Sequence, residues 1–304
     1  MRCWSVPSVG EARFGRRLLH LAEGAGALAI YAVFRLLPLD AASALGGFLA
    51  RSLGPRGAFS RRARRNLQRA MPELSADEVE RVLLGMWDNL GRVVAEYPHL
   101  GKYQVYARDG RVEICGAENI RDQAAAGKRA IFFSGHFGNW EVATLAVTQA
   151  GLDVVEMYRA ANNPFVDALI NHSRRVVGSE LAAMGSGGAR RMLAAMKGER
   201  HIAMLVDQKS NDGIPVPFFG RDAMTAPSLA VFALRFDCAV VPVRVDRLEG
   251  ARFRITAEPP LDLPRTGDTE ADTRAIMTRV NQVLERWIRE RPDHWFWLHR
   301  RWPD

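Results

Sequence analysis

Lysine and cysteine are scarce in this 304-residue chain, and several common motifs are missing. Only four of its 42 basic residues are lysine, so arginine carries nearly all of the positive charge. The three cysteines, Cys3, Cys115 and Cys238, lack metal-ligand or redox spacing, which favours a reducing compartment over a disulfide framework. The glycine-rich stretch 185–188 lacks the lysine of a phosphate-binding loop, and no zinc pattern occurs. We therefore expect neither a metal nor a cofactor.

Two further classes are disfavoured by what the sequence does not contain. A lipid hydrolase needs a nucleophile, and Ser134 lies outside any Gly-x-Ser-x-Gly elbow. Nucleic-acid binding ranks low because no finger, RNP or helix-turn-helix pattern accompanies the net charge of +8. Arginine binds phosphates and carboxylates bidentately, so this charge suits anionic lipid headgroups or an acidic protein. A codon bias toward arginine and alanine explains the same charge.

Long uncharged runs are missing as well, which bears on the N-terminal segment. Residues 18–39 are strongly apolar, yet the longest uncharged run, 24–34, has 11 residues, short of the roughly 20 of a clean membrane span. We expect residues 1–55 to form a retained helical membrane anchor, either a tilted span or an interfacial helix, with its N-terminus on the cytoplasmic side. A buried helix of a soluble core is the alternative. Residues 56–304 would form the catalytic domain.

The rest of the chain alternates between helical and strand-like patterns. Ser75 and Glu78 form a capping box for a helix that ends near Pro98. The alternation that follows predicts an α/β fold, a mostly parallel central sheet flanked by helices on both faces. Strands are expected at 112–115, 130–133, 154–158, 202–206, 240–245 and 253–257, and helices at 118–126, 140–150, 164–177, 189–197, 225–236 and 270–289.

A histidine follows one of these strands at a turn. Residues 130–133 read as a buried strand, Gly138 allows a sharp turn, and Asn139 is placed to cap the next helix. His136 would then stand at the end of a buried strand, where open α/β sheets place their chemistry. We expect Glu141 to orient His136 as a general base, which requires an irregular backbone between them. A structural histidine at a strand-to-helix turn is the competing interpretation.

Polar residues recur where other expected strands end. The carboxyl ends of parallel strands meet at one edge of a sheet, so these residues are expected to surround His136 and bind substrate. A local hydrogen bond in a loop is the alternative for each residue taken alone. The candidate binding residues are Asn139, Trp140, Arg159, Asp207, Gln208 and Lys209.

Residues 135–141, Gly-His-Phe-Gly-Asn-Trp-Glu, carry a family resemblance. The His-x4-Glu spacing resembles the lysophospholipid acyltransferase superfamily, and the longer string resembles its lipid A branch, the late (lauroyl/myristoyl) acyltransferases. The Pro-Glu-Gly-Thr block of the glycerolipid enzymes is missing, which favours lipid A as acceptor. Other matching pieces occur in the family's order at 64–67, 158–159, 207–208, 217–220 with Thr225, and 295–302.

The resemblance implies an enzyme of lipopolysaccharide biosynthesis at the cytoplasmic face of a bacterial inner membrane. It would move a fatty acyl chain from acyl carrier protein to a 3-hydroxyacyl hydroxyl of a lipid A precursor. His136 would be the base and Glu141 its partner, with no acyl-enzyme. An acyltransferase for a glycerolipid, an ornithine lipid or a mannosylated inositol lipid is an alternative. A non-catalytic membrane protein that binds anionic lipid is another.

Overall fold

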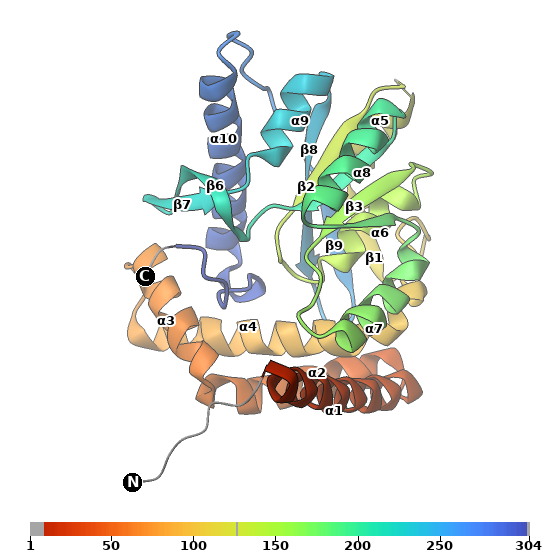
Figure 1. Ribbon diagram of the computed structural model, residues 1–304, viewed down its shortest axis with the longest axis vertical. Helices are drawn as coiled ribbons and strands as arrows, with labels where there is room; N and C mark the ends of the chain where they lie inside the picture. The colour runs from red at the N-terminus through yellow and green to blue at the C-terminus, as the bar shows by residue number, and fades with distance from the viewer. Residues whose placement is uncertain (1–8, 126, 303–304) are drawn as a thin grey trace.

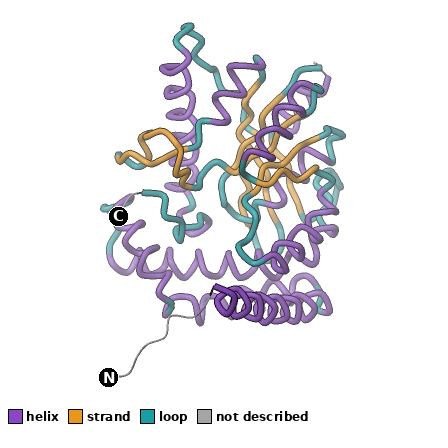
Figure 2. Tube along the Cα trace, viewed as in Figure 1, coloured by secondary structure: helices purple, strands orange, loops and turns teal. Residues whose placement is uncertain are grey.

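The computed structural model describes residues 9–125 and 127–302. Our expectations for residues 1–8, Ala126 and residues 303–304 lie outside this range. In the described part, a seven-stranded sheet with helices on both faces forms the centre, and long N-terminal helices lie below it (Figures 1 and 2).

The sheet has the strand order β1-β9-β8-β2-β5-β3-β4, and a separate antiparallel hairpin, β6–β7, stands beside it. Among the described strands of the sheet, only β8 and β9 pair antiparallel. This confirms the expected mostly parallel α/β architecture. The strands are β1 (Val112–Cys115), β2 (Ala130–Ser134), β3 (Val154–Tyr158), β4 (Glu180–Ala183), β5 (His201–Leu205), β6 (Lys209–Phe218), β7 (Arg221–Thr225), β8 (Ala239–Arg247) and β9 (Phe253–Ala257).

Two apolar layers fill the space between the sheet and its helices. One layer joins α5 and α6 to the sheet, and the other joins α8, α9 and α10 to the opposite face. All five residues of β2 are buried, as expected of a central strand covered on both sides. The helices of the domain are α5 (Ala117–Ala125), α6 (Glu141–Thr148), α7 (Pro164–Arg174), α8 (Ser186–Lys197), α9 (Ser228–Phe236) and α10 (Thr269–Glu290), with short 3-10 turns η3 (Arg175–Val177) and η4 (Pro292–His294).

The N-terminal helices underlie this domain. The capping box at Ser75 is present and begins α4, which lies between α2 and the sheet (Figure 1). Helices α2 and α4 cross at two glycines, because a Cβ on Gly46 would stand 2.4 Å from the carbonyl oxygen of Gly91. These elements are α1 (Val9–Leu36), α2 (Leu39–Leu53), η1 (Gly54–Arg56), α3 (Ala58–Ala70), α4 (Ala76–Glu96) and η2 (Tyr97–Lys102).

Each expected strand is present within one or two residues, and each expected helix within about three. Strand β4 and the β6–β7 hairpin were not predicted. Neighbouring strands β2 and β5 run parallel, with Ser134 beside Leu205 in register. Their carboxyl ends therefore lie side by side and bring the residues that follow each strand together.

Candidate active site

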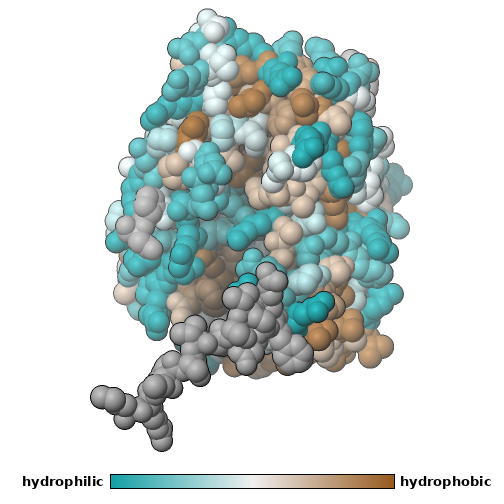
Figure 3. All heavy atoms as spheres, viewed as in Figure 1, coloured by the Kyte–Doolittle hydropathy of each residue, from teal (hydrophilic) through white to brown (hydrophobic). Residues whose placement is uncertain are grey.

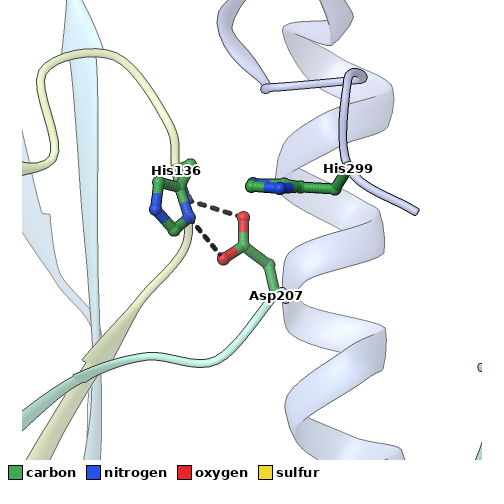
Figure 4. Close-up of side chains that lie close together, drawn as sticks. All are labelled: His136, Asp207 and His299. Carbon is green, nitrogen blue, oxygen red and sulfur yellow. Dashed lines mark hydrogen bonds and ion pairs between the residues drawn. The ribbon is translucent and has the colours of Figure 1, made fainter. Parts of the chain in front are cut away.

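His136 and Asp207 follow these two neighbouring strands and hold each other by two hydrogen bonds. The His136 backbone amide donates to Oδ2 of Asp207 at 2.7 Å, and the ring Nδ1 lies 2.8 Å from Oδ1 (Figure 4). The His136 side chain is 13% exposed and that of Asp207 is fully buried. The sheet thus fixes a histidine–carboxylate pair at its edge, with the histidine on the accessible side.

Asp207 stays ionised in this pair. Burial alone would raise its pKa, but the His136 ring and the hydrogen bonds it receives hold the pKa well below the usual range. One of those bonds comes from the indole nitrogen of Trp295, 2.8 Å from Oδ2. An ionised carboxylate only accepts hydrogen bonds, so Nδ1 of His136 carries the proton.

This tautomer leaves Nε2 of a neutral His136 with a free lone pair. The side-chain amide of Gln208 lies 3.2 Å from Nε2 and donates to it. A donor at this position occupies the place that a substrate hydroxyl would take. The pair is therefore arranged as a general base whose tautomer is set by its carboxylate.

The structure does not pair Glu141 with His136 as the sequence predicted, because the Glu141 carboxylate binds another set of partners. Arg174 donates to it twice, at 2.6 and 2.8 Å, and the hydroxyl of Tyr97 donates at 2.6 Å. Burial would raise the pKa of Glu141, but the charge of Arg174 and these bonds hold it below the usual value. As the first residue of α6, Glu141 is tied to Arg174 at the end of α7. The carboxylate that orients His136 is Asp207, which we had placed among the binding residues.

The turn between His136 and α6 is tightly fixed. Gly138 has a φ of +56°, and a Cβ there would stand 2.2 Å from the Val245 carbonyl oxygen. Asn139 is fully buried, accepts from the Glu141 amide and donates to Glu96 at 2.8 Å. The Asn139 side chain is thus engaged within the turn, but the N-cap of α6 is Trp140, one residue later than predicted, and it makes no side-chain capping bond.

A buried ion pair supports this turn from below. Arg247 on β8 binds the Glu96 carboxylate through both of its terminal nitrogens, and its Nε donates to Asn89. Asn89 in turn donates to the Gly138 carbonyl oxygen at 2.9 Å. Helix α4 and strand β8 thereby set the position of the backbone that leads away from His136.

The C-terminal segment 295–302, which we call the C-terminal strap, completes the site. Besides the indole of Trp295, it contributes Phe296 and His299, whose ring centroids lie 6.2 and 4.8 Å from that of His136. Asn66 on α3 donates to the carbonyl oxygens of Trp297 and His299. In the sequence this segment is only one of the pieces that match the family, and no periodicity indicates that it returns to the edge of the sheet.

Of the remaining predicted binding residues, Trp140 lies beside the dyad, and Arg159 and Lys209 are exposed. Trp140 stands beside His136, with ring centroids 5.0 Å apart, and its indole donates to Glu141. Arg159 follows β3 and is exposed, and its charge reaches His299. Lys209 is exposed at the first position of β6. The structure therefore assembles Trp140, Asp207 and Gln208 at His136, and leaves the two cations at exposed positions.

His136, Asp207 and His299 carry side chains of the kind that bind metal ions. Ring nitrogens of His136 and His299 and a carboxylate oxygen of Asp207 lie within 4.8 Å of one another (Figure 4). Both oxygens of Asp207 already accept hydrogen bonds, and a metal ion would break the bond that sets the tautomer of His136. The arrangement fits a hydrogen-bonded base better than a metal centre.

A histidine paired with a buried carboxylate at the carboxyl edge of an α/β sheet is an arrangement that can accept a proton from a hydroxyl. Comparison with known proteins gives the class: the chain belongs to the bacterial lipid A biosynthesis acyltransferase family, whose profile matches residues 11–304. It is an acyltransferase, as its family and its relatives are named.

Individual relatives agree with this assignment. The chain is 28% identical over 245 residues to the lipid A biosynthesis lauroyltransferase of Escherichia coli (strain K12), covering 78% of this chain and 76% of the relative. It is 26% identical over 255 residues to the myristoyltransferase of the same organism, covering 82% and 77%. It is also 24% identical over 290 residues to the phosphatidylinositol mannoside acyltransferase of Mycobacterium tuberculosis (strain CDC 1551 / Oshkosh), covering 92% and 87%.

Proposed function

We propose that this enzyme transfers a fatty acyl chain from acyl carrier protein to the hydroxyl of a 3-hydroxyacyl chain on a lipid A precursor. The observation that carries the proposal is the His136–Asp207 pair, with Nε2 of His136 facing a donor that a hydroxyl can replace. The family assignment supplies the lipid class, and the dyad supplies the means to activate a hydroxyl.

The proposed reaction uses the tautomer of His136 in which Nδ1 carries the proton and Nε2 is free to accept one. Nε2 of His136 removes the proton of the acceptor hydroxyl as the oxygen attacks the thioester carbonyl, and the Asp207 carboxylate stabilises the imidazolium that forms. The tetrahedral intermediate then collapses with cleavage of the carbon–sulfur bond. His136 returns its proton to the departing thiolate of the carrier protein, so no acyl-enzyme is formed.

Glu141 has a positioning role in this proposal. Its bonds to Arg174 and Tyr97 tie α6 to α7 and to η2, directly behind the turn that carries His136. A pair buried this deeply costs desolvation and is held together by several hydrogen bonds, so it specifies geometry more than it adds stability.

The charge of the chain suits both proposed substrates. Acyl carrier protein is acidic and lipid A precursors carry phosphates, so a net charge of +8 favours their association with the enzyme. Arg159 and Lys209 are the exposed cations that follow strands β3 and β5 on the site's edge of the sheet, where an anionic substrate group would be held.

Helices α1 and α2 attach the enzyme to the cytoplasmic face of the inner membrane in this proposal. Residues Gly15–Leu36 form a helix long and apolar enough to cross a bilayer. Figure 3 shows hydrophobic surface at the lower right of the molecule, over these helices. The exposed large apolar side chains there are Leu18, Leu19, Leu21, Leu28, Ile30, Val33, Leu36, Leu45, Phe48, Leu49 and Leu53.

Purified enzyme tests this function when incubated with acyl-acyl carrier protein or acyl-coenzyme A and a lipid A precursor. We expect product with the carrier-protein donor, detected by mass spectrometry, and a loss of at least about 10² in kcat for His136→Ala. His172→Ala is the matched control, since His172 is an exposed histidine of α7. Near-normal turnover by a folded His136→Ala enzyme would eliminate the mechanism.

A second acceptor class is favoured by one observation. The mycobacterial relative, named for a mannosylated inositol lipid, aligns over 92% of this chain, more than either Escherichia coli transferase. Offering both acceptors in competition decides between them. Preferential labelling of the mannosylated inositol lipid would overturn lipid A as acceptor while leaving the chemistry of the dyad intact.

A further inference from the structure

His299 is a second histidine beside the base, and its surroundings are unusual. Its Nε2 is buried and has no hydrogen-bond partner among the described residues. A buried polar atom without a partner costs about 1–3 kcal/mol, so such atoms are rare unless a ligand supplies the missing bond. The ring extends from the C-terminal strap toward His136 and Asp207 (Figure 4).

The ring of His299 is held in place before any substrate arrives. Asn66 fixes its backbone by donating to the His299 carbonyl oxygen at 2.9 Å. Two residues later, the buried Arg301 donates to the Met224 carbonyl oxygen and to the side chains of Thr225 and Asn281. The edge of the ring contacts Phe296, with centroids 4.6 Å apart. A donor fixed in this way needs no reorganisation during a reaction.

His299 remains neutral at physiological pH. Burial is the largest cause that lowers the pKa of His299, to about 3, and a proton on His136 and the charges of Arg301 and Arg159 act in the same direction. His299 is therefore a poor base and carries no charge that would oppose an imidazolium at His136, 4.8 Å away between ring centroids. A neutral imidazole still offers one N–H donor.

The proposed reaction creates a need for such a donor. When the hydroxyl oxygen at Nε2 of His136 attacks the thioester, the carbonyl oxygen within a few ångströms of it becomes an oxyanion. Building on the proposed function, we propose that His299 donates a hydrogen bond from Nε2 to this oxygen. His299 would thus be a catalytic residue that stabilises the oxyanion, distinct from the base.

Two nearly isosteric substitutions test the role. Methionine at this position removes both nitrogens, whereas glutamine keeps an N–H donor at a similar distance from the backbone. We expect His299→Met to lower kcat by about 10²–10³ with the KM for acyl-acyl carrier protein nearly unchanged, as for loss of one oxyanion donor. We expect His299→Gln to recover at least about tenfold of that loss.

Controls separate this inference from the function on which it rests. His172→Met should leave kcat unchanged, and far-ultraviolet circular dichroism checks that each variant is folded. If His299→Met does not fold, the inference is tested with His299→Gln alone. If His299 is an oxyanion donor, the glutamine variant must keep more than about a hundredth of wild-type kcat.

The outcomes that overturn the inference are specific. Turnover of His299→Met within about twofold of wild type, a loss confined to KM, or a glutamine variant as impaired as the methionine variant would each exclude an oxyanion donor. An inactive His136→Ala combined with a fully active His299→Met would reject only this inference. An active His136→Ala would instead reject the proposed function.

Discussion

Two buried carboxylates stand near His136, and their environments give them different roles. Asp207 accepts from the histidine ring, a backbone amide and an indole, and all of these donors are uncharged in the resting tautomer. Glu141 is neutralised by the guanidinium of Arg174. Only the first carboxylate can stabilise charge that appears on His136 during a reaction, whereas the charge of the second is already compensated.

Replacing Asp207 with asparagine tests the first role. An amide NH2 placed near Nδ1 would turn that nitrogen into an acceptor and move the ring proton to Nε2, which could no longer accept a proton from a hydroxyl. We expect kcat to fall by at least about 10², with a small change in thermal stability. Steady-state kinetics and thermal unfolding of the purified variant measure both. A variant with more than about a tenth of wild-type kcat would contradict Asp207 as the partner.

Replacing Glu141 with glutamine should give the opposite signature. The substitution leaves the buried Arg174 without its counter-charge, and we expect the free energy of unfolding to fall by about 3 kcal/mol, as for a broken buried pair. The tautomer of His136 is untouched, so the folded fraction should keep more kcat than Asp207→Asn. Urea unfolding monitored by tryptophan fluorescence gives the free energy. Unchanged stability with abolished turnover would instead support the sequence-based pairing of Glu141 with His136.

At the level of elements, the sequence predicted the parallel sheet and the meeting of polar residues at its edge. It paired His136 with Glu141, whereas the carboxylate in contact is Asp207, because this contact depends on β2 and β5 being neighbours, which no local pattern encodes. Strand β4 and the β6–β7 hairpin were missed because they are short, polar or interrupted by proline, and lack a clear period of two. The strap was missed because its position rests on single contacts such as Trp295 to Asp207.

The turn after β2 is the element whose geometry matters most for His136. In Gly138→Ala, the new Cβ would stand 2.2 Å from the Val245 carbonyl oxygen at a position with a positive φ. We therefore expect the free energy of unfolding to fall by about 3 kcal/mol or more, and kcat to fall as well. Gly151→Ala is the matched control, since φ is +89° there but nothing lies within 4 Å of the added atom. The free energy of unfolding of Gly151→Ala should fall by about 1 kcal/mol, and its kcat should be unchanged. Equal effects in urea unfolding and turnover would show that close packing of the turn is unimportant.

For the whole molecule, the sequence left open whether the N-terminal helix spans a bilayer or lies on it. The structure docks α1 along the domain at both ends of its apolar stretch. Asn163 donates to Glu23 at 2.9 Å, and Arg35 donates to the Pro98 carbonyl oxygen at 3.2 Å. A helix held against the domain in this way presents its opposite face to a membrane surface, which favours the interfacial alternative.

An interfacial attachment predicts reversible binding that depends on the exposed face of α1. Placing glutamate at Leu18 and Val33, which are 52% and 54% exposed, should weaken sedimentation with phosphatidylglycerol-containing vesicles at least about tenfold, because each substitution removes apolar burial worth on the order of 1–2 kcal/mol. The same change at Val231 and Met184, 44% and 47% exposed on other elements, is the control and should bind normally. Alkaline carbonate should release the wild-type protein from membranes, since its backbone would not cross the hydrocarbon core. Retention after carbonate treatment would show that α1 leaves the domain and spans the bilayer.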